Sequence, residues 1–186
     1  MDIRAQLLQE HSRRNAEAIA THVGDDPERF AVLMRCMLED DPRVGQRAAQ
    51  SVGMVCARYP QLATPYVERL LDALDAPVRE AVQRNSVRTL QYSALPARLH
   101  GRITNRMFDL IADPSRAIAQ RAFAITVAGR MVERYPELTD EFRVLLERVS
   151  LEGASAGIRS RVAKALRTLG RRSGTHRVHS GQDEQR

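Results

Sequence analysis

The chain has 186 residues, of which 43% are hydrophobic, and a formal net charge of +6. This length and composition fit one globular domain with its own core, and they exclude a chain that is disordered throughout. No apolar run approaches the roughly 18 residues of a membrane-spanning helix, and the N-terminal residues lack the pattern of a signal peptide. We therefore expect a cytoplasmic protein that does not enter a membrane, with Cys36 and Cys56 as buried thiols.

The basic surplus lies at the C-terminal end of the chain. Residues 1–154 contain 21 basic and 21 acidic side chains, so the whole excess of positive charge belongs to residues 155–186. A basic segment of this kind is compatible with phosphate binding. It is weaker evidence for nucleic-acid binding than a domain that is basic throughout.

Apolar residues recur with helical periodicity along most of the chain, and helix-start signals divide the pattern into segments. The first helix is expected from about residue 2 to residue 22, with a kink near Ser12. The second begins at Asp26-Pro27, because aspartate can cap exposed N–H groups and proline suits the first helical position. Further helices are expected at about 42–59, 61–74, 77–92, 96–112, 114–135, 137–149 and 156–169. Residues 171–186 contain almost no apolar side chain, so we expect one domain over 1–170 and a disordered tail.

A short phrase recurs four times along the chain. Its first copy is Val44-Gly45-Gln46-Arg47-Ala48, and the later copies begin at Val78, Ile118 and Ile158. Each copy places a β-branched residue four positions before a second apolar residue, so both lie on one helical stripe. The copies are 34 to 40 residues apart with no strand signal between them, which is typical of stacked helical repeats. We interpret the β-branched residues as seams between helix pairs.

A second repeated motif is the Tyr-Pro dipeptide, which occurs at 59–60 and again at 135–136. Proline cannot continue the preceding helix, so each dipeptide is expected at the corner between the two helices of a pair. Arg47 and Arg121 occupy the same place in two copies of the repeated phrase, beside the apolar stripe. We expect them to form ion pairs between repeats, and we expect Asn85 to form a buried hydrogen bond between repeats.

The Asp-Pro helix starts at 41–42 and 113–114 and the Val/Ile-x-x-Arg-Ala phrase make the chain resemble HEAT-like, armadillo-type α-solenoids over about residues 26–169. This resemblance implies an all-α, right-handed α-α superhelix of about four helix pairs and a C-terminal capping helix. The chain is also similar to small bacterial HEAT-like proteins of unassigned function, some of which have carried the name adenylosuccinate lyase. The lyase loop Gly-Ser-Ser-x-Met-Pro-x-Lys-x-Asn has no counterpart in this sequence.

Catalytic and metal-binding motifs are missing from the sequence. The histidines form no His-Glu-x-x-His pattern, and there is no Gly-x-Ser-x-Gly or phosphate-loop sequence. The acidic residues 39–41 are interpreted as one helix end followed by the cap of the next helix. His176 and His179 could bind a metal, but no cysteine in this part of the sequence supports such a site. We therefore expect no enzymatic activity, no cofactor and no metal.

The candidate binding residues are polar side chains of the two central helices: Arg84, Arg88, Arg98, Arg102, Asn105 and Arg106. Arg98, Arg102 and Arg106 recur every four positions, so they form a row on one helix. The resemblance places the second helix of each pair on the concave face, so this row is expected to line a groove. The shorter row on the preceding helix is expected on the convex side. Structural pairing with carboxylates is the alternative interpretation of these arginines.

These observations predict a scaffold that binds another protein through its curved face without catalysing a reaction. The alternative is a nucleic-acid-binding protein similar to HEAT-like DNA-repair glycosylases, which use a basic concave face. In that alternative, the central arginine row and the basic C-terminal segment would contact phosphates. The absence of tryptophan from the sequence weakens it, because such proteins stack bases on aromatic surfaces. The sequence leaves the oligomeric state open.

Overall fold

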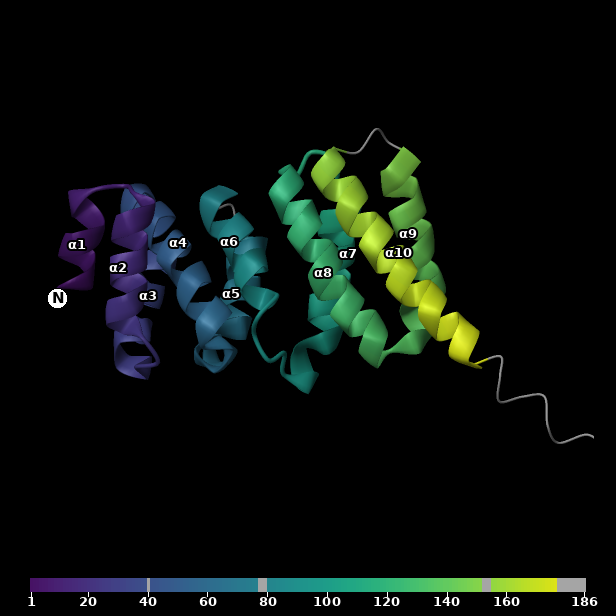
Figure 1. Cartoon of the computed structure of the whole chain (residues 1–186), viewed down its shortest axis with the longest axis horizontal. Coiled ribbons are helices and arrows are strands. Elements are labelled where there is room, and N and C mark those ends of the chain that lie inside the picture. The colour runs from purple at the N-terminus through teal and green to yellow at the C-terminus, as the bar shows by residue number, and fades with distance from the viewer. Residues whose placement is uncertain (40, 77–79, 152–154, 177–186) are drawn as a thin grey trace, which may run out of the picture. The chain divides into compact units, whose positions relative to one another are not determined.

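The computed structural model describes residues 1–39, 41–76, 80–151 and 155–176, with side chains up to residue 170. Across these ranges the chain forms ten α-helices and three short 3-10 helices, with no strand (Figure 1). The all-α prediction is confirmed. Among the described helices, none combines the length and the hydrophobicity needed to cross a membrane.

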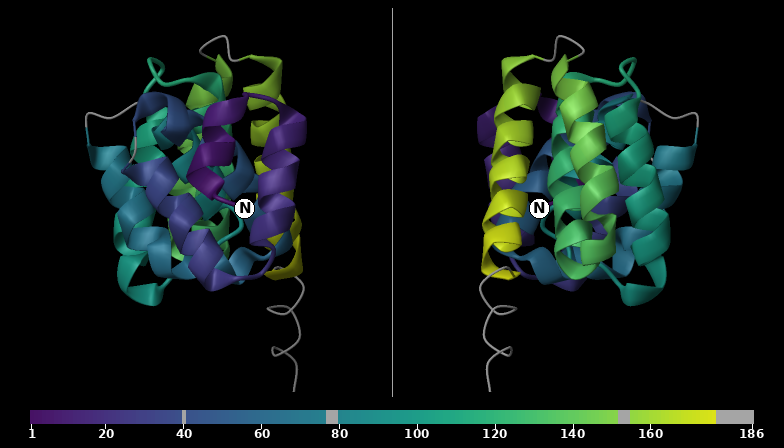
Figure 2. Two further views of the ribbon diagram at one scale, coloured as in Figure 1. Left: turned by 90° about the vertical axis from the view of Figure 1, so that its left-hand side faces the viewer. Right: turned by 90° about the vertical axis from the view of Figure 1, so that its right-hand side faces the viewer.

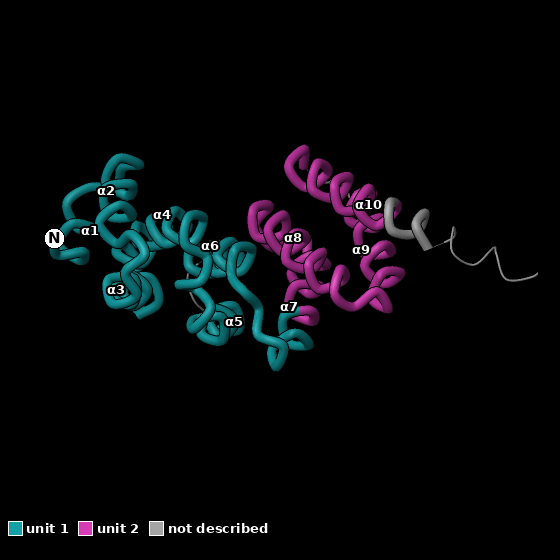
Figure 3. The backbone as a smooth tube through the Cα atoms, turned by 60° about the horizontal axis from the view of Figure 1, so that its bottom comes forward, with its two compact units in different colours: residues 1–103 teal, residues 104–186 magenta. Residues whose placement is uncertain are grey.

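The chain divides into two compact units, unit 1 from Met1 to Ile103 and unit 2 from Thr104 to Arg186 (Figure 3). The predicted end of the last helix, at about residue 169, is too early, because this helix continues from Ala156 to His176 and so covers the first six residues of the predicted tail. Arginine is a good helix former, so the two arginines that follow residue 170 are compatible with this longer helix. The rest of the predicted tail, with His179, lies outside the described residues. The assignment of residues 1–170 to one domain stays a prediction.

Unit 1 contains the first six helices and two 3-10 helices. Their bounds are Ile3–Gln9 (α1), Arg13–Val23 (α2), Pro27–Leu38 (α3), Pro42–Arg58 (α4), Pro60–Tyr66 (η1), Val67–Asp75 (α5), Glu80–Leu90 (α6) and Ala97–Leu99 (η2). Helix α4 packs against α2, α3 and α6, and α5 packs against α6. The first helices of successive pairs, α2, α4 and α6, are therefore neighbours, and α3 and α5 cover them as second helices.

Helix α7, His100–Ala112, begins in unit 1 and continues into unit 2, which also contains Ile118–Arg134 (α8), Pro136–Leu138 (η3), Thr139–Leu151 (α9) and Ala156–His176 (α10). Helix α10 packs against both α8 and α9, and its place beside α9 is visible in Figure 2, right. Phe142 of α9 is fully buried and stacks on Phe108 of α7, with ring centroids 5.7 Å apart. Ile158 and Val162 bury the inner face of α10.

Asp26 and Asp41 cap helices, as the sequence predicts. Asp26 precedes α3 and Asp41 precedes α4, and each side chain accepts hydrogen bonds from the backbone N–H groups two and three residues ahead, at 2.8–3.1 Å. A proline fills the first helical position in both cases. The bond from the Arg29 backbone N–H is the main cause that lowers the pKa of Asp26.

The first predicted helix is in fact two helices. Helix α1 ends at Gln9, and Ser12 caps α2 by accepting a hydrogen bond of 3.0 Å from the Asn15 backbone N–H. The buried Asn15 side chain donates to the backbone carbonyls of Gln6 and Glu10, at 2.9 and 3.0 Å. These bonds satisfy carbonyls at the end of α1 and replace the helical bonds that a continuous helix would form.

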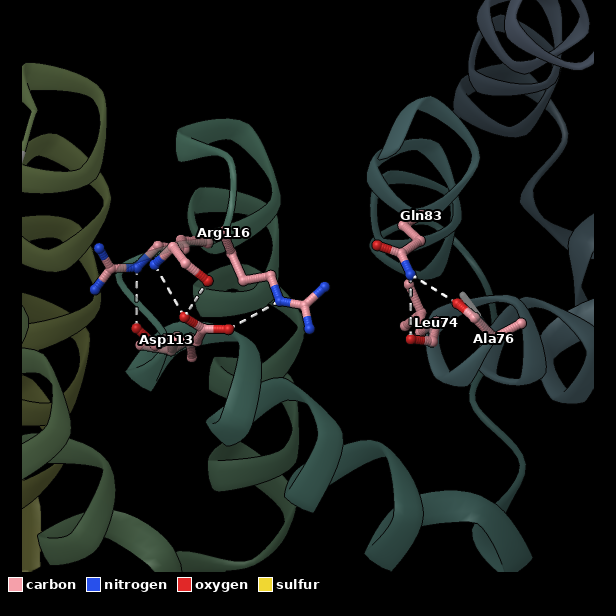
Figure 4. Close-up of polar contacts among 8 residues, drawn as sticks. Leu74, Ala76, Gln83, Asp113 and Arg116 are labelled. Atoms are coloured by element: carbon pink, nitrogen blue, oxygen red, sulfur yellow. Dashed lines mark hydrogen bonds and ion pairs between the residues drawn. The ribbon is translucent and has the colours of Figure 1, made fainter. Parts of the chain in front are cut away.

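The predicted helix start at Asp113 is wrong, because α8 begins at Ile118. The Asp113 carboxylate instead accepts bonds from the Ser115 hydroxyl at 2.6 Å, from the Ser115 backbone N–H at 2.9 Å and from Arg116 Nε at 3.0 Å (Figure 4). The Ser115 hydroxyl is the largest cause that lowers the pKa of Asp113. Serine two residues after an aspartate favours a local turn over continued helix.

The Tyr-Pro dipeptides form the predicted corners. Tyr59 ends α4 and Tyr135 ends α8, with nearly equal backbone angles of φ −131°, ψ 67° and φ −125°, ψ 80°. Each proline opens a 3-10 helix, η1 or η3, that leads into the second helix of the pair. The predicted starts at 61 and 137 are therefore 3-10 turns, and α5 and α9 begin after them.

The seam interpretation of the repeated phrase holds in part. The second apolar residue of every copy is buried, and so are Val44 and Ile158. Ile118, however, is 56% exposed, because it is the first residue of α8. Val78 lies outside the described residues. Both cysteines are buried as expected, and burial raises the pKa of Cys56 to about 12.

Candidate interaction surface

Helix α5 has one apolar face and one charged face. Its buried face consists of Val67, Leu70, Leu71 and Leu74. Glu68, Asp72 and Asp75 are exposed at positions i, i+4 and i+7, so their carboxylates follow one stripe of the helix surface.

Two of the predicted binding arginines meet this acidic stripe within unit 1. Arg98 Nη2 lies 2.7 Å from Glu68 Oε2, and Arg102 Nη2 lies 2.8 Å from Asp72 Oδ1 and 2.5 Å from Asp75 Oδ2. The hydrogen bond with Arg98 lowers the pKa of Glu68 and raises that of Arg98. Arg102 also has a raised pKa, first because of its bond to Asp75 and then because of its bond to Asp72. The structure thus gives these two arginines carboxylate partners.

A further ion pair extends the charged stripe to α3, where Arg69 of α5 binds Glu39 at the C-terminal end of that helix. We call these three groups of ion pairs the ion-pair ladder; it consists of Glu39, Glu68, Arg69, Asp72, Asp75, Arg98 and Arg102. The ladder joins the second-helix side of three successive repeats. It contains four carboxylates and three guanidinium groups, so it alternates in charge instead of being basic.

A hollow of about 280 Å³ adjoins the ladder, and Glu39, Arg69 and Asp72 form its rim. Its apolar lining consists of Leu38, Ala73, Ala76 and Val82. Next in the chain after Val82, the Gln83 amide donates to the backbone carbonyls of Leu74 at 3.5 Å and Ala76 at 3.1 Å (Figure 4). These bonds satisfy carbonyls at the end of α5, where no helical N–H is available.

The other predicted site residues are not part of the ladder. Asn105 is exposed and Arg106 is half-buried, and both belong to unit 2. Arg84 and Arg88 are half-buried on α6. The Arg88 guanidinium covers Gly53 of α4, where an added Cβ would lie only 3.2 Å from Arg88 Cζ. Arg88 therefore takes part in the packing of α4 against α6.

The arginines of the repeated phrase bind backbone carbonyls at helix ends. Arg47 Nη1 donates to Leu7 and Leu8 of α1, at 2.7 and 3.1 Å, and Arg121 Nε donates to Ile111 of α7 at 3.0 Å. The expected ion pairs between repeats stay a prediction. Asn85 is buried, but its described bond runs to the Ala81 carbonyl of its own helix, at 2.8 Å.

The α5 carboxylates are the residues that sequence reasoning missed. The sequence did contain a signal for them. Acidic residues at i, i+4 and i+7 of α5 lie about one repeat before Arg98 and Arg102, which are themselves four positions apart. Metal binding has no support in the part of the chain that the structure describes, where no three His, Cys, Asp or Glu side chains form a cluster suited to an ion.

Comparison with known proteins agrees with the helix-pair architecture. The family model described as HEAT repeat domain matches residues 3–169, which is most of the chain. Searches of curated proteins and of solved structures gave no significant match. The match spans α1 to α10 and includes both Tyr-Pro corners and all four copies of the repeated phrase. The chain therefore belongs to the HEAT repeat domain family.

Proposed function

We propose that the chain is a non-catalytic protein-binding module whose partner docks on the ion-pair ladder and its adjoining hollow. The observation that carries this proposal is the alternation of paired, exposed charges beside a partly apolar hollow on the second-helix side of unit 1. Protein interfaces combine an apolar centre with a polar rim, and complementary charges fix the partner and its orientation.

The same alternation argues against nucleic acid as the ligand of this surface. A phosphate that approaches Arg98 or Arg102 also approaches Glu68, Asp72 and Asp75, and their charges oppose its binding. Phosphate recognition relies on clusters of cations that release bound counterions, and a ladder with more carboxylates than arginines lacks that excess. A protein partner can place its own basic and acidic groups opposite the two kinds of charge.

Affinity capture with matched variants tests the proposal. The full chain would be used to capture proteins from its native source, beside two surface variants, Arg98→Glu on the ladder and Ala73→Arg in the hollow. Arg13→Glu is the control, because Arg13 is 81% exposed and pairs with Glu17 on α2, away from the ladder. We expect a partner that the wild type and the control retain and that both surface variants lose.

Quantitative mass spectrometry of the captured proteins gives the readout, and circular dichroism confirms that each variant is folded. Hydrogen exchange of the complex should then show protection in α3 and α5. Equal capture by the wild type and both surface variants would overturn the proposed surface.

A further inference from the structure

Unit 2 contains a hollow of about 190 Å³ that the proposed function does not use. Helices α8 and α10 line it with the small residues Thr126, Gly129, Ala165 and Thr168, and the buried side chains of Ile125, Phe142 and Leu169 also line it. A Cβ added at Gly129 would have no atom within 4 Å, so this glycine leaves open space at the wall. The lining therefore combines buried apolar side chains with short side chains.

The charged residues around this hollow are mostly cationic. Arg130, Arg161 and Lys164 line it together with one carboxylate, Glu133. Arg161 Nη1 donates to Thr126 Oγ1 at 2.5 Å, and this bond between α10 and α8 holds one guanidinium at the edge. Burial lowers the pKa of Arg130, although Glu133 opposes that effect, so an approaching anion would favour its charged form.

The size of the hollow limits what it can hold. A cavity of about 150 Å³ accepts a benzene-sized molecule, whereas sites for cofactors and other complete ligands measure about 300–1,000 Å³. At about 190 Å³, the hollow fits one large apolar side chain. Burial of a single large side chain in a matching pocket is a common source of affinity in protein interfaces.

We propose that this hollow is a docking pocket for one large apolar side chain within an acidic segment of a partner protein. The apolar side chain would contact Phe142, Leu169 and Ile125, and acidic residues on either side of it would pair with Arg130, Arg161 and Lys164. This inference rests on the proposed role in protein binding, but it concerns a surface in unit 2 that shares no residue with the ion-pair ladder.

Selection of short random peptides against the full chain tests the pocket. We expect enrichment of peptides with one Phe, Leu or Met flanked by Asp or Glu. Gly129→Leu should weaken their binding at least about tenfold, because the new side chain fills the hollow. Leucine is also a better helix former than glycine, so thermal unfolding should show that this variant is folded.

Gly101→Leu is the matched control, because Gly101 also has no atom near an added Cβ but lies in unit 1. It should bind the peptides like the wild type. Lys164→Glu should weaken binding about fivefold at low salt, with a smaller difference at high salt, because the exposed charge is screened.

Three outcomes would overturn the pocket: no enrichment of acidic peptides, equal binding by Gly129→Leu and the wild type, or tighter binding of free 3-phenylpropionate than of the selected peptides. The last result would assign the hollow to a small carboxylate. Arg98→Glu should leave peptide binding unchanged, which would show that the pocket acts independently of the ladder. Affinity capture tests the ladder separately, so the two proposals can fail independently.

Discussion

Individual carboxylates decide where the helices of this chain begin and how its turns are fixed. Asp41 and Asp113 both precede proline, but Asp41 caps α4 whereas Asp113 binds Ser115 and Arg116 within a turn. The difference lies in the residues that follow. Ser115 supplies a hydroxyl donor as well as an N–H group, so the Asp113 carboxylate is occupied before a helix can use it as a cap.

Loss of the Asp41 cap should destabilise the fold. Asp41→Ala removes the acceptor of two backbone N–H groups at the start of α4, which packs against α1, α2, α3 and α6. We expect the free energy of unfolding to fall by about 1 kcal/mol, as measured by urea denaturation. Asp41→Asn keeps a capping oxygen and should lose clearly less; an equal loss for both variants would contradict the capping role.

The Asp113 turn should make stability depend on pH in the acid range. The pKa of Asp113 is lowered from its ordinary value of 3.8, so its stabilising bonds are fully present above that pH and are lost as the pH falls through the lowered pKa. The free energy of unfolding should therefore fall as the wild type is acidified below 3.8. Asp113→Asn should show a smaller fall, and parallel pH curves for the two proteins would disprove this contribution.

At the scale of helices, packing depends on how closely two elements can approach. Gly53 lets the Arg88 side chain cross the surface of α4, and Phe142 of α9 fills the space against Phe108. Arg47 and Arg121 act differently, because they bind carbonyls at the ends of α1 and α7. The repeated arginine thus satisfies acceptors that the end of a helix leaves unpaired.

Removal of the Phe142 ring should be costly, because this side chain is fully buried. Phe142→Ala is expected to lower the free energy of unfolding by about 3–5 kcal/mol, through lost burial and the cavity that remains. Val144→Ala on the same helix is the control: Val144 is 65% exposed, so its change should stay within about 0.5 kcal/mol. Urea denaturation measures both variants, and similar losses would contradict the packing of α9.

Two glycine substitutions should differ because only one meets a neighbour. Gly101→Ala is expected to stabilise the protein by about 0.5–1 kcal/mol, since alanine favours helix and the added Cβ lies in open space. Gly53→Ala should stabilise the protein less than Gly101→Ala, because the Arg88 side chain must move to make room for the added Cβ. Thermal unfolding of Gly53→Ala with and without Arg88→Ala measures this coupling, and a gain that is independent of Arg88 would show that the contact is unimportant.

At the scale of the whole molecule, the distribution of charge matters more than its sum. The excess of +6 belongs entirely to residues 155–186, and the described part of that segment is α10. In unit 1, the central arginines Arg98 and Arg102 are paired with carboxylates. A strongly basic chain can therefore have a charge-alternating surface at its candidate interface.

Any binding of DNA at low salt should consequently depend on α10. The exposed cationic residues of that helix include Arg159, Lys164 and Arg167. Their exchange for Gln should reduce the slope of log affinity against log salt by about two to three. The exchange of Arg98 and Arg102 for Gln should leave that slope unchanged. A salt titration with labelled duplex and single-stranded DNA measures the slope for both sets of variants. A slope that falls only when Arg98 and Arg102 are exchanged would favour the nucleic-acid alternative.

Local signals in the sequence were sufficient for much of the fold. The caps at Asp26 and Asp41 and the corners at Tyr59 and Tyr135 involve groups within a few residues of one another, so the order of residues predicts them. The same local reasoning failed at Ser12, where the Asn15 side chain stabilises two helices in place of one. It also failed at Ile118, whose exposure depends on where α8 begins.

The candidate surface required tertiary structure. The sequence by itself determined that the chain is a stack of helix pairs with exposed arginines near its centre, because apolar periodicity and turn residues act over short distances. Only the folded chain decided that Arg98 meets Glu68, thirty residues earlier, and that small residues of α8 and α10 enclose a hollow. Such contacts depend on how neighbouring repeats pack, and packing is fixed by side-chain shape across elements, which one-dimensional periodicity does not record.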